Sequence, residues 1–275
     1  MRTHLPVSVI IPLFNAKLTI FRAIDSIIQQ SRKPAEVIIV DDASNDRTSK
    51  NDYLKKIESI LKKNYIKTII IKNKINQGPA FSRNEGWKKA TQKYIAFLDA
   101  DDSWAKHKLN FQFYFMKNNN NLDATCHDTK FLNNDQNDLK NIKVDKSVKG
   151  RIVYLIELFF KNKIQTRTVM IKKNLVERFD PKIRYSEDLD LWLRLIFNKK
   201  KIYYIDEKLA FCFKYPMSKH SLSSHYADFW KSEINVLAKN SYRSFLILLL
   251  PLIITFSYIK FLTRILGLRD PKNKV

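Results

Sequence analysis

The sequence predicts an α/β fold in which a mostly parallel β-sheet is flanked by helices and followed by an apolar helical tail. Three observations predict it. Over the first hundred residues, short β-branched runs alternate with segments of helical spacing, and polar residues come directly after several of these runs. Near the C-terminus, a long stretch carries no charge. A chain of 275 residues, 45% of them hydrophobic, is long enough to bury such a core.

Four apolar runs are predicted to be buried strands that alternate with helices. The predicted strands cover residues 7–12, 37–40, 66–71 and 94–98. Between them, the apolar residues of 18–30 recur at helical spacing, residues 53–61 form a second helix, and Pro79 begins a third at a position that proline favours. Strands joined by crossover helices pair in parallel with right-handed connections.

The second half is predicted to continue the sheet after a surface excursion. The polar runs 118–121 and 133–149 form this mobile excursion. The elements expected beyond it are a helix at 152–160, a strand at 166–171, a helix at 188–197 and a strand at 202–213. We therefore divide the chain into a domain of residues 1–220, with halves at about 1–105 and 106–220, and a helical tail at 221–275.

The charge of the chain restricts its partners. Lys and Arg number 50 against 27 Asp and Glu, so the net charge is +23. Such a field attracts nucleic acid, anionic lipid surfaces or phosphorylated substrates. The basic residues are scattered without a dense block, so we expect no nucleic-acid partner. A biased genome composition explains scattered lysines equally well.

The cysteines and the N-terminus point to a reducing compartment. Cys126 and Cys212 are far apart in sequence, and neither lies in a CxxC or Cys/His cluster, so we expect reduced core residues within strands. The N-terminal segment has only a short apolar run and no small-residue cleavage pattern, which does not fit a signal peptide. The expected location is the cytoplasm, at the inner face of the cytoplasmic membrane.

The membrane location is expected because of the apolar C-terminal tail. Residues 245–259 carry no charge, contain Pro251, and precede Lys260, Arg264 and Arg269. A straight helix of that length covers about 22 Å, short of a hydrocarbon core of about 30 Å, although extension to residue 262 would nearly span it. The alternatives are an interfacial helix, a marginal transmembrane helix, and a core or dimer-interface helix. We favour a helix lying in the plane of an anionic membrane.

Polar residues follow three of the predicted strands, where a parallel sheet binds ligands. They are Phe14-Asn15 after the first strand, Asp41-Asp42 after the second, and the acidic cluster 99–102 after the fourth. A single Asp in such a place is ordinarily a helix cap. Acids after two strands at one edge of one sheet indicate a site for a cation or a phosphorylated ligand.

The acidic cluster has the composition of a divalent-metal site. Asp99 and Asp101 form a D-x-D pair, and Asp102 adds a third carboxylate. Mg²⁺ and Mn²⁺ prefer one or two carboxylates completed by water and phosphate oxygens. The alternative is that lysines of this basic protein pair with the aspartates. We expect a divalent cation, Mn²⁺ or Mg²⁺, as cofactor.

Four segments resemble the family 2 glycosyltransferases, an inverting group with the GT-A fold. They are VSVIIPLFNA near the start, EVIIVDDASND at 36–46, NQGPAFSRNEGWKKATQKYIAFLDADDSW at 76–104, and SEDLDLWLRL at 186–195. They occur in the order and spacing of the family and most resemble its bacterial cell-surface polysaccharide enzymes. The resemblance implies transfer of a sugar from a nucleotide-sugar donor, with a UDP-sugar favoured, to a glycan or lipid-linked acceptor.

The resemblance also assigns roles on the donor side. Pro12, Phe14 and Asn15 match the loop that lines the nucleotide base, and Asp42 matches the carboxylate that accepts from the base edge. Asn76, Gly78 and Arg83 match the segment that approaches the nucleotide and phosphates, although Arg83 alone fits a solvated helix residue. Asp99 would face the ribose or donor sugar, and Asp101 would ligate the metal. Asp102 has no assigned role beyond capping a turn.

On the acceptor side, the resemblance assigns the catalytic base to Asp188. Glu187 and Asp188 also suit a helix start, where the helix dipole favours carboxylates. Glu187, Trp192 and His220 are further acceptor-side candidates, with core packing the simpler interpretation of Trp192. His220 is a candidate third metal ligand or phosphate contact, but its spacing departs from the family, and Lys214 stands where many relatives carry Arg.

Two other functions remain open on sequence alone. A nucleotidyltransferase on a related sheet also uses acids and a metal, but residues 9–15 lack the glycine of its N-terminal loop. A non-enzymatic module for basic binding to membranes or nucleic acid fits the charge and the tail, but leaves the acidic segments at 99–102 and 187–188 without a purpose.

Overall fold

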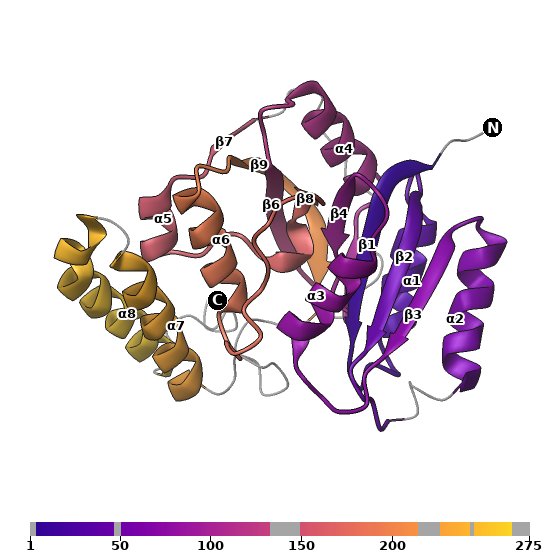
Figure 1. The fold of residues 1–275 in the computed structure, drawn as a ribbon, viewed down its shortest axis with the longest axis horizontal. Helices are drawn as coiled ribbons and strands as arrows, with labels where there is room; N and C mark the ends of the chain where they lie inside the picture. The colour runs from indigo at the N-terminus through magenta and orange to yellow at the C-terminus, as the bar shows by residue number, and fades with distance from the viewer. Residues whose placement is uncertain (1–3, 47–50, 133–148, 214–225, 243–244, 266–275) are drawn as a thin grey trace.

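The computed structural model describes residues 4–46, 51–132, 149–213, 226–242 and 245–265. Within them, the strands form one nine-stranded sheet whose main path runs β3-β2-β1-β4-β8-β6-β9-β5, with β7 paired to β9. Helices cover both faces of the sheet, and two further helices, α7 and α8, stand beside α5 and α6 at one end of the molecule (Figure 1). All described strands end before residue 213.

The N-terminal half of the sheet is parallel, as predicted. It comprises β1 (Leu5–Leu13), β2 (Pro34–Asp41), β3 (Lys67–Lys72) and β4 (Tyr94–Phe97). Each neighbouring pair runs in the same direction. The strands β1, β2 and β4 are central and buried on both faces, which leaves no polar alternation, whereas β3 lies at the edge of the sheet and is only partly buried.

The C-terminal half of the sheet is mixed. The short strand β8 (Met170–Lys172) is antiparallel to both β4 and β6 (Ala124–Phe131). β6 in turn lies parallel to β9 (Ile202–Cys212), to which β5 (Asp102–Trp104) and β7 (Gly150–Ile152) pair in the opposite direction. The expected parallel sheet therefore holds for the donor half, and the second half departs from it.

The two faces of the sheet bury two separate cores. One core joins the sheet to α3 (Pro79–Lys89), α5 (Leu155–Phe160) and α6 (Glu187–Phe197). The other joins it to α1 (Ile20–Ile28), α2 (Asn51–Lys63) and α4 (Lys108–Asn118). Side chains of β1 alternate between them, with Ile10 in the first core and Val9 and Ile11 in the second.

Helix α3 lies unusually close to the sheet at Gly86. A Cβ at this position would meet the Cγ2 of Ile10 at 2.5 Å. Only glycine allows this approach, which fixes α3 and its preceding loop against the strand ends that carry the predicted site.

Several elements differ from the sequence prediction, among them the three-residue strands β5 and β7, where no strand was predicted. The helix expected at 152–160 begins only at Leu155, because Ile152 pairs with Tyr203 in the β7–β9 ladder. The strand expected at 166–171 starts as the 3-10 turn η2 (Thr166–Thr168) and becomes β8 only at Met170. Helix α4 has no counterpart in the prediction, since its apolar residues do not form a single stripe. Of the excursion expected at 118–121 and 133–149, residues 133–148 lie outside the described residues, and residues 118–121 form the end of α4 and the turn that follows it.

The tail is helical, as expected. It comprises α7 (Tyr226–Ser241), the 3-10 helix η4 (Phe245–Leu249) and α8 (Leu250–Ile265). Pro251 does not interrupt the helix, because it occupies the first turn of α8, where the missing N–H costs nothing. Cys126 and Cys212 form no disulfide, are buried, and are located in β6 and β9, which confirms the sequence prediction.

Candidate active site

The predicted donor residues leave the sheet from neighbouring strand ends. The N–H of Asp42 donates to the carbonyl of Leu13 (2.8 Å), and that of Leu98 donates to Ile10 (3.0 Å). The segments that follow β1, β2 and β4 are therefore adjacent. The parallel register brings Asn15, Asp42 and Asp99 to one edge of the sheet, as the sequence predicts.

Asp42 organises the loop that precedes α3. Its carboxylate accepts from the backbone N–H groups of Gln77 (3.0 Å) and Gly78 (2.7 Å) and from the side chain of Asn73 (2.7 Å). Asp42 is buried, and both of its oxygens are engaged in this way. Gly78 has a φ of 88°, and a Cβ there would meet nothing within 4 Å, so the backbone of this loop borders open space. Asp42 thus shapes the segment to which the family resemblance assigns the phosphates.

Asn15 performs a similar task for the loop after β2. Its side-chain oxygen accepts from the N–H groups of Asn45 (2.9 Å) and Asp46 (3.2 Å), and its own N–H donates to Ser44 (3.0 Å). The positive φ of Asn15, 49°, is one that asparagine tolerates well. Phe14 beside it is 49% exposed, a position from which an aromatic ring can meet a planar ligand.

Arg83 joins the two halves of the site. Its guanidinium donates to Asp99 after β4 (2.8 Å) and to Glu187 at the start of α6 (2.9 Å). The side chain is only 7% exposed, so the solvated-helix interpretation is wrong. Burial pushes the pKa of Asp99 upward, but Arg83 and Arg167 outweigh it and hold that pKa below its ordinary value. For Glu187, burial wins and the pKa is raised.

The remaining acids of the cluster also lie among arginines. Asp102 forms an ion pair with Nε of Arg167 (2.8 Å), and Arg22 donates to the backbone carbonyl of Asp101. Burial raises the pKa of Asp102 to about 8, with Asp101 and Asp99 adding to the effect and Arg167 opposing it. The alternative of pairing with basic residues is thus realised for Asp99 and Asp102, by arginines rather than lysines. Asp102 is more than a turn cap.

The side chains around Asp101 suit a metal ion that binds together with a phosphorylated ligand better than one that the protein holds alone. Among the residues that the structure describes, no group of three His, Cys, Asp or Glu side chains is placed to hold a metal ion. Asp101 is partly exposed, whereas Asp102 is buried. Mg²⁺ is commonly bound through one or two carboxylates, with the rest of its shell from water and phosphates, and Asp101 satisfies that requirement.

Asp188 lies in the first turn of α6, next to the Arg83 bridge. Its carboxylate accepts from the N–H of Leu189 (2.7 Å) and from the side chain of Asn162 (3.4 Å). Burial, reinforced by the charge of Glu187, raises the pKa of Asp188 to about 7. A carboxylate with such a pKa is well matched to accept a proton at neutral pH.

The other acceptor-side candidates have different outcomes in the structure. Trp192 has no exposed surface, and its Nε1 donates to the carbonyl of Ile164 (3.1 Å), so it is a core residue and not an acceptor contact. Glu187 is the partner of Arg83. His220 and Lys214 lie outside the described residues.

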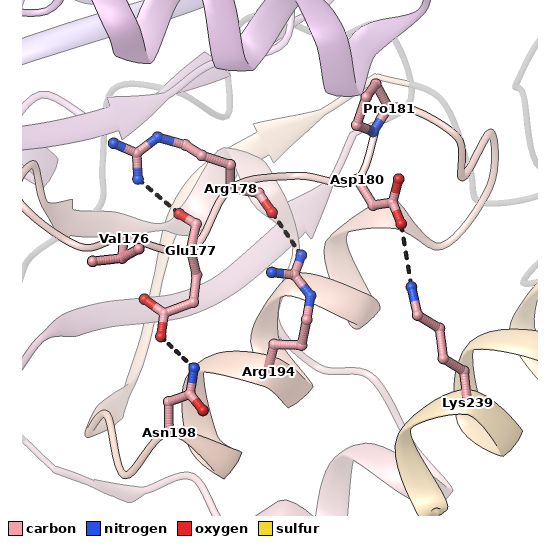
Figure 2. Close-up of a pocket in the computed structure, with 8 residues that line it drawn as sticks. All are labelled: Val176, Glu177, Arg178, Asp180, Pro181, Arg194, Asn198 and Lys239. Carbon is pink, nitrogen blue, oxygen red and sulfur yellow. Dashed lines mark hydrogen bonds and ion pairs between the residues drawn. The ribbon is translucent and has the colours of Figure 1, made fainter. Parts of the chain in front are cut away.

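A separate hollow lies at the far end of α6 from Asp188. Figure 2 shows its lining, which includes Arg178, Arg194 and Lys239. The cations are already engaged: Arg194 pairs with Asp190 (2.7 Å), and Lys239 pairs with Asp180 (3.2 Å). Lys239 thus ties α7 to the loop that precedes α6, and Arg194 ties α6 to the same loop by donating to the carbonyl of Arg178 (2.6 Å). We therefore interpret this surface as structural.

Three residues of the site were not predicted from the sequence. Arg22 and Arg167 flank the acidic cluster, and Asn162 contacts the candidate base. They come from α1, η2 and the loop after α5, and none lies in the acidic motifs themselves. The packing of α1 against β5, of η2 against β9 and of α5 against α6 brings them to the site.

Known proteins share both the sequence pattern and the fold. Residues 8–180 match Glycosyl transferase family 2. TuaG of Bacillus subtilis (strain 168), a proposed teichuronic acid biosynthesis glycosyltransferase, is 33% identical over 221 residues, which cover 80% of this chain and 82% of TuaG. WfgD of Escherichia coli, a UDP-Glc:alpha-D-GlcNAc-diphosphoundecaprenol beta-1,3-glucosyltransferase, is 31% identical over 219 residues, or 80% of each chain.

The similarity extends to solved structures. The crystal structure of S. aureus TarS 1-349 in complex with UDP-GlcNAc matches with a TM-score of 0.68 and 20% identity, covering 97% of this chain and 74% of that one. This likeness confirms the predicted GT-A-like fold. Two of the sequence relatives, uncharacterized glycosyltransferases of Rickettsia felis and Rickettsia conorii, are much longer than this chain. The matched residues cover 74% of this chain but only 32% of each of these relatives.

Proposed function

The chain belongs to glycosyl transferase family 2, and we propose that it transfers a sugar from a nucleoside-diphosphate donor to a glycan or lipid-linked acceptor with inversion. The observation that carries this proposal is the Arg83 bridge. It holds Asp99, at the donor edge of the sheet, and Glu187, beside the candidate base Asp188, on one guanidinium. A single displacement needs donor and base fixed together in this way.

On the donor side, the loops after β1 and β2 and the loop before α3 form the nucleotide site. Phe14 lies against the base, and Asn15 and Asp42 fix the loops around it through their hydrogen bonds. The backbone at Gly78 and the side chain of Asn76 border the phosphates, and Asp99 orients the sugar or ribose. UDP-sugars are the favoured donors, since TarS binds UDP-GlcNAc and WfgD uses UDP-Glc by their names.

Charge on the leaving diphosphate is balanced by a divalent cation and by arginines. When bound, Mn²⁺ or Mg²⁺ supplies Lewis-acid stabilisation of the departing diphosphate. Asp101 would be its protein ligand, because the family resemblance assigns the metal to this position and Asp101 is partly exposed, whereas Asp102 is buried. Arg22 holds the Asp101 backbone, and Arg167 holds Asp102, so the turn that presents Asp101 is fixed.

On the acceptor side, Asp188 removes the proton from the attacking hydroxyl. The oxygen then attacks the anomeric carbon from the face opposite the diphosphate, whose bond to that carbon breaks as the new bond forms. Asn162 and the N–H of Leu189 hold the carboxylate in position. Burial, reinforced by the charge of Glu187, keeps the pKa of Asp188 high.

The acceptor class follows from the relatives and the charge. WfgD acts on a diphosphoundecaprenol-linked sugar by its name, and TuaG is assigned to teichuronic acid biosynthesis. A chain of net charge +23 suits an acceptor that carries a diphosphate and lies in an anionic membrane. We place the enzyme in the cytoplasm, at the inner face of the cytoplasmic membrane, in cell-surface polysaccharide synthesis.

One assay tests the proposal against its rivals. The full chain is incubated with Mn²⁺ or Mg²⁺ and a panel of UDP-, GDP- and TDP-sugars, and the released nucleotide is measured with and without a bacterial lipid extract as acceptor source. Acceptor-stimulated release of a nucleoside diphosphate is expected. Release of pyrophosphate would indicate a nucleotidyltransferase, and an absence of nucleotide chemistry with every donor would reject catalysis.

A further inference from the structure

The outward face of the C-terminal helices is apolar. Large side chains exposed there recur every three or four residues, so they lie on one face of η4 and α8: Leu248, Leu252, Phe256, Ile259 and Leu262. We name these five residues the apolar stripe. The opposite face of α8 packs on the protein through Ile253, Ser257 and Lys260, all of them buried. Within the described part of the chain, each of the five keeps at least 38% of its surface exposed.

The length and composition of this segment would also suit a membrane span. The window Leu246–Thr263 has a mean hydropathy of 2.1, and 22% of it is buried. A core helix would be mostly buried, so the segment is not one. The choice is therefore between a helix that crosses the membrane, one that lies in its plane, and one that meets another protein.

Lys260 decides against crossing. Its ammonium forms an ion pair with Glu233 of α7 (2.6 Å) and donates to the carbonyl of Phe160, the last residue of α5 (3.3 Å). Both charged side chains are less than one-tenth exposed. Withdrawing α8 into a bilayer would separate a buried ion pair, which is strongly destabilising. The pair instead fixes α8 against the domain, with the stripe facing outward.

The charge near the stripe favours an anionic lipid surface over a second copy of the chain. Two copies of a protein with net charge +23 repel each other, whereas anionic headgroups attract it. Phe160 packs on Phe256 with ring centroids 5.4 Å apart, and the exposed Lys161 and Lys163 follow it directly. Lysines at the rim of an apolar face are placed to meet phosphate headgroups.

Aromatic residues border the same helix. The rings of Trp230 and Phe261 stack with centroids 5.0 Å apart, and Tyr258, whose ring lies 5.7 Å from Trp230, is 46% exposed. Tryptophan and tyrosine gather at the interface between headgroups and hydrocarbon, because their rings are apolar and their N–H or O–H groups polar.

The stripe is linked to the candidate base by a short path. Phe160, which touches both Phe256 and Lys260, lies two residues before Asn162, and Asn162 donates to Asp188. We propose that η4 and α8 lie in the plane of an anionic membrane with the apolar stripe inserted, so that acceptors held in the bilayer reach Asp188 from the α5 side. The acceptor part of this proposal rests on the proposed function; the docking part does not.

Vesicle binding tests the docking directly. The full chain is mixed with vesicles of phosphatidylcholine alone or with phosphatidylglycerol added, and the bound fraction is measured by sedimentation. The double variant Leu252→Glu, Ile259→Glu should bind the anionic vesicles at least tenfold more weakly than the wild type. Tyr65→Glu is the matched control, because Tyr65 is 85% exposed and follows α2, at the other end of the molecule from α8 (Figure 1).

The outcomes are separable from those of the catalytic proposal. Equal binding by the stripe variant and the wild type, or no binding by either, would overturn the docking. A wild-type dimer that the stripe variant turns into a monomer would assign the stripe to a second copy instead. Lys161→Gln with Lys163→Gln should weaken binding only to the anionic vesicles.

Two controls accompany the stripe variant. Its hydrolysis of the donor to nucleoside diphosphate, measured without membranes, should equal that of the wild type. The milder double variant Leu252→Ser, Ile259→Ser checks that the introduced charge alone does not cause the loss of binding.

Discussion

Replacing Arg83 by methionine removes the bridge between the donor and acceptor halves while keeping a long side chain in place. The two carboxylates that it holds are poorly solvated: 26% of the Asp99 side chain is exposed and 13% of that of Glu187. The substitution leaves both carboxylates without the buried guanidinium of Arg83. The prediction is a loss of folding stability together with a loss of activity.

The size of the loss follows from this burial. Removing one partner of a buried ion pair costs about 3–5 kcal/mol. Because Asp99 retains some contact with water, we expect the lower end, about 3 kcal/mol. At roughly 2–4 °C per kcal/mol for a chain of this size, the melting temperature should fall by about 6–12 °C.

Thermal unfolding measured at several pH values checks this prediction. The wild-type pKa of Asp99 is lowered, so its contribution to stability is present at neutral pH and is lost as the pH falls through that folded-state pKa. The deficit of Arg83→Met should therefore narrow in acid. Lys88→Met is the control, since Lys88 is exposed on the same helix. A melting temperature within a degree or two of wild type at neutral pH would refute the bridge.

Three further predictions concern packing, protonation and the cation. Gly86→Ala should destabilise the protein by about 1–2 kcal/mol in denaturant titration, because the added methyl overlaps the stiff side chain of Ile10; an unchanged midpoint would contradict that packing. Turnover should fall about tenfold per pH unit below the Asp188 pKa of about 7, since the base must be a carboxylate. Glu187→Gln should move this acid limb to lower pH, and an unmoved limb would exclude Asp188 as its source. Asp101→Ala should abolish the metal dependence of donor binding in calorimetry, and unchanged affinity with and without Mn²⁺ would reject the ligand role.

The donor half could be predicted from sequence because its determinants are local. Apolar runs ending in acids give strands and strand ends, and a parallel register then places Asn15, Asp42 and Asp99 together without further information. The start of α3 at Pro79 followed from helix-start chemistry in the same way, and α6, predicted from residue 188, begins one residue earlier at Glu187.

The pairings within the site could not be predicted. Arg83 meets Glu187 across 104 residues, and Arg167 meets Asp102 only because β5 and η2 lie against the same part of the sheet. Sequence composition suggested lysines as partners of the acidic cluster, but the structure uses arginines, whose planar guanidinium can serve two carboxylates at once. Helix α4 was missed because its fold depends on packing rather than on a periodic pattern.

The orientation of the C-terminal tail could not be predicted from the sequence either. The apolar run 245–259 predicts a membrane-seeking helix but not which of its sides faces the protein. Burial of Lys260 against Glu233 settles that side. The sequence singles out Lys260 as a basic residue after the apolar run, but it does not reveal Glu233 as its partner.

The central claim is that Asp188 is the base of a glycosyl transfer, and one comparison tests it most directly. Nucleoside diphosphate release in the presence of acceptor is measured for the wild type and for Asp188→Asn, with donor binding by calorimetry alongside. General-base assistance contributes about 10²–10⁴-fold, so turnover should fall by that factor while donor affinity changes little. Asparagine can still accept the bond from Leu189 that the carboxylate accepts now, which keeps α6 in place. Near-normal turnover by Asp188→Asn would contradict the account.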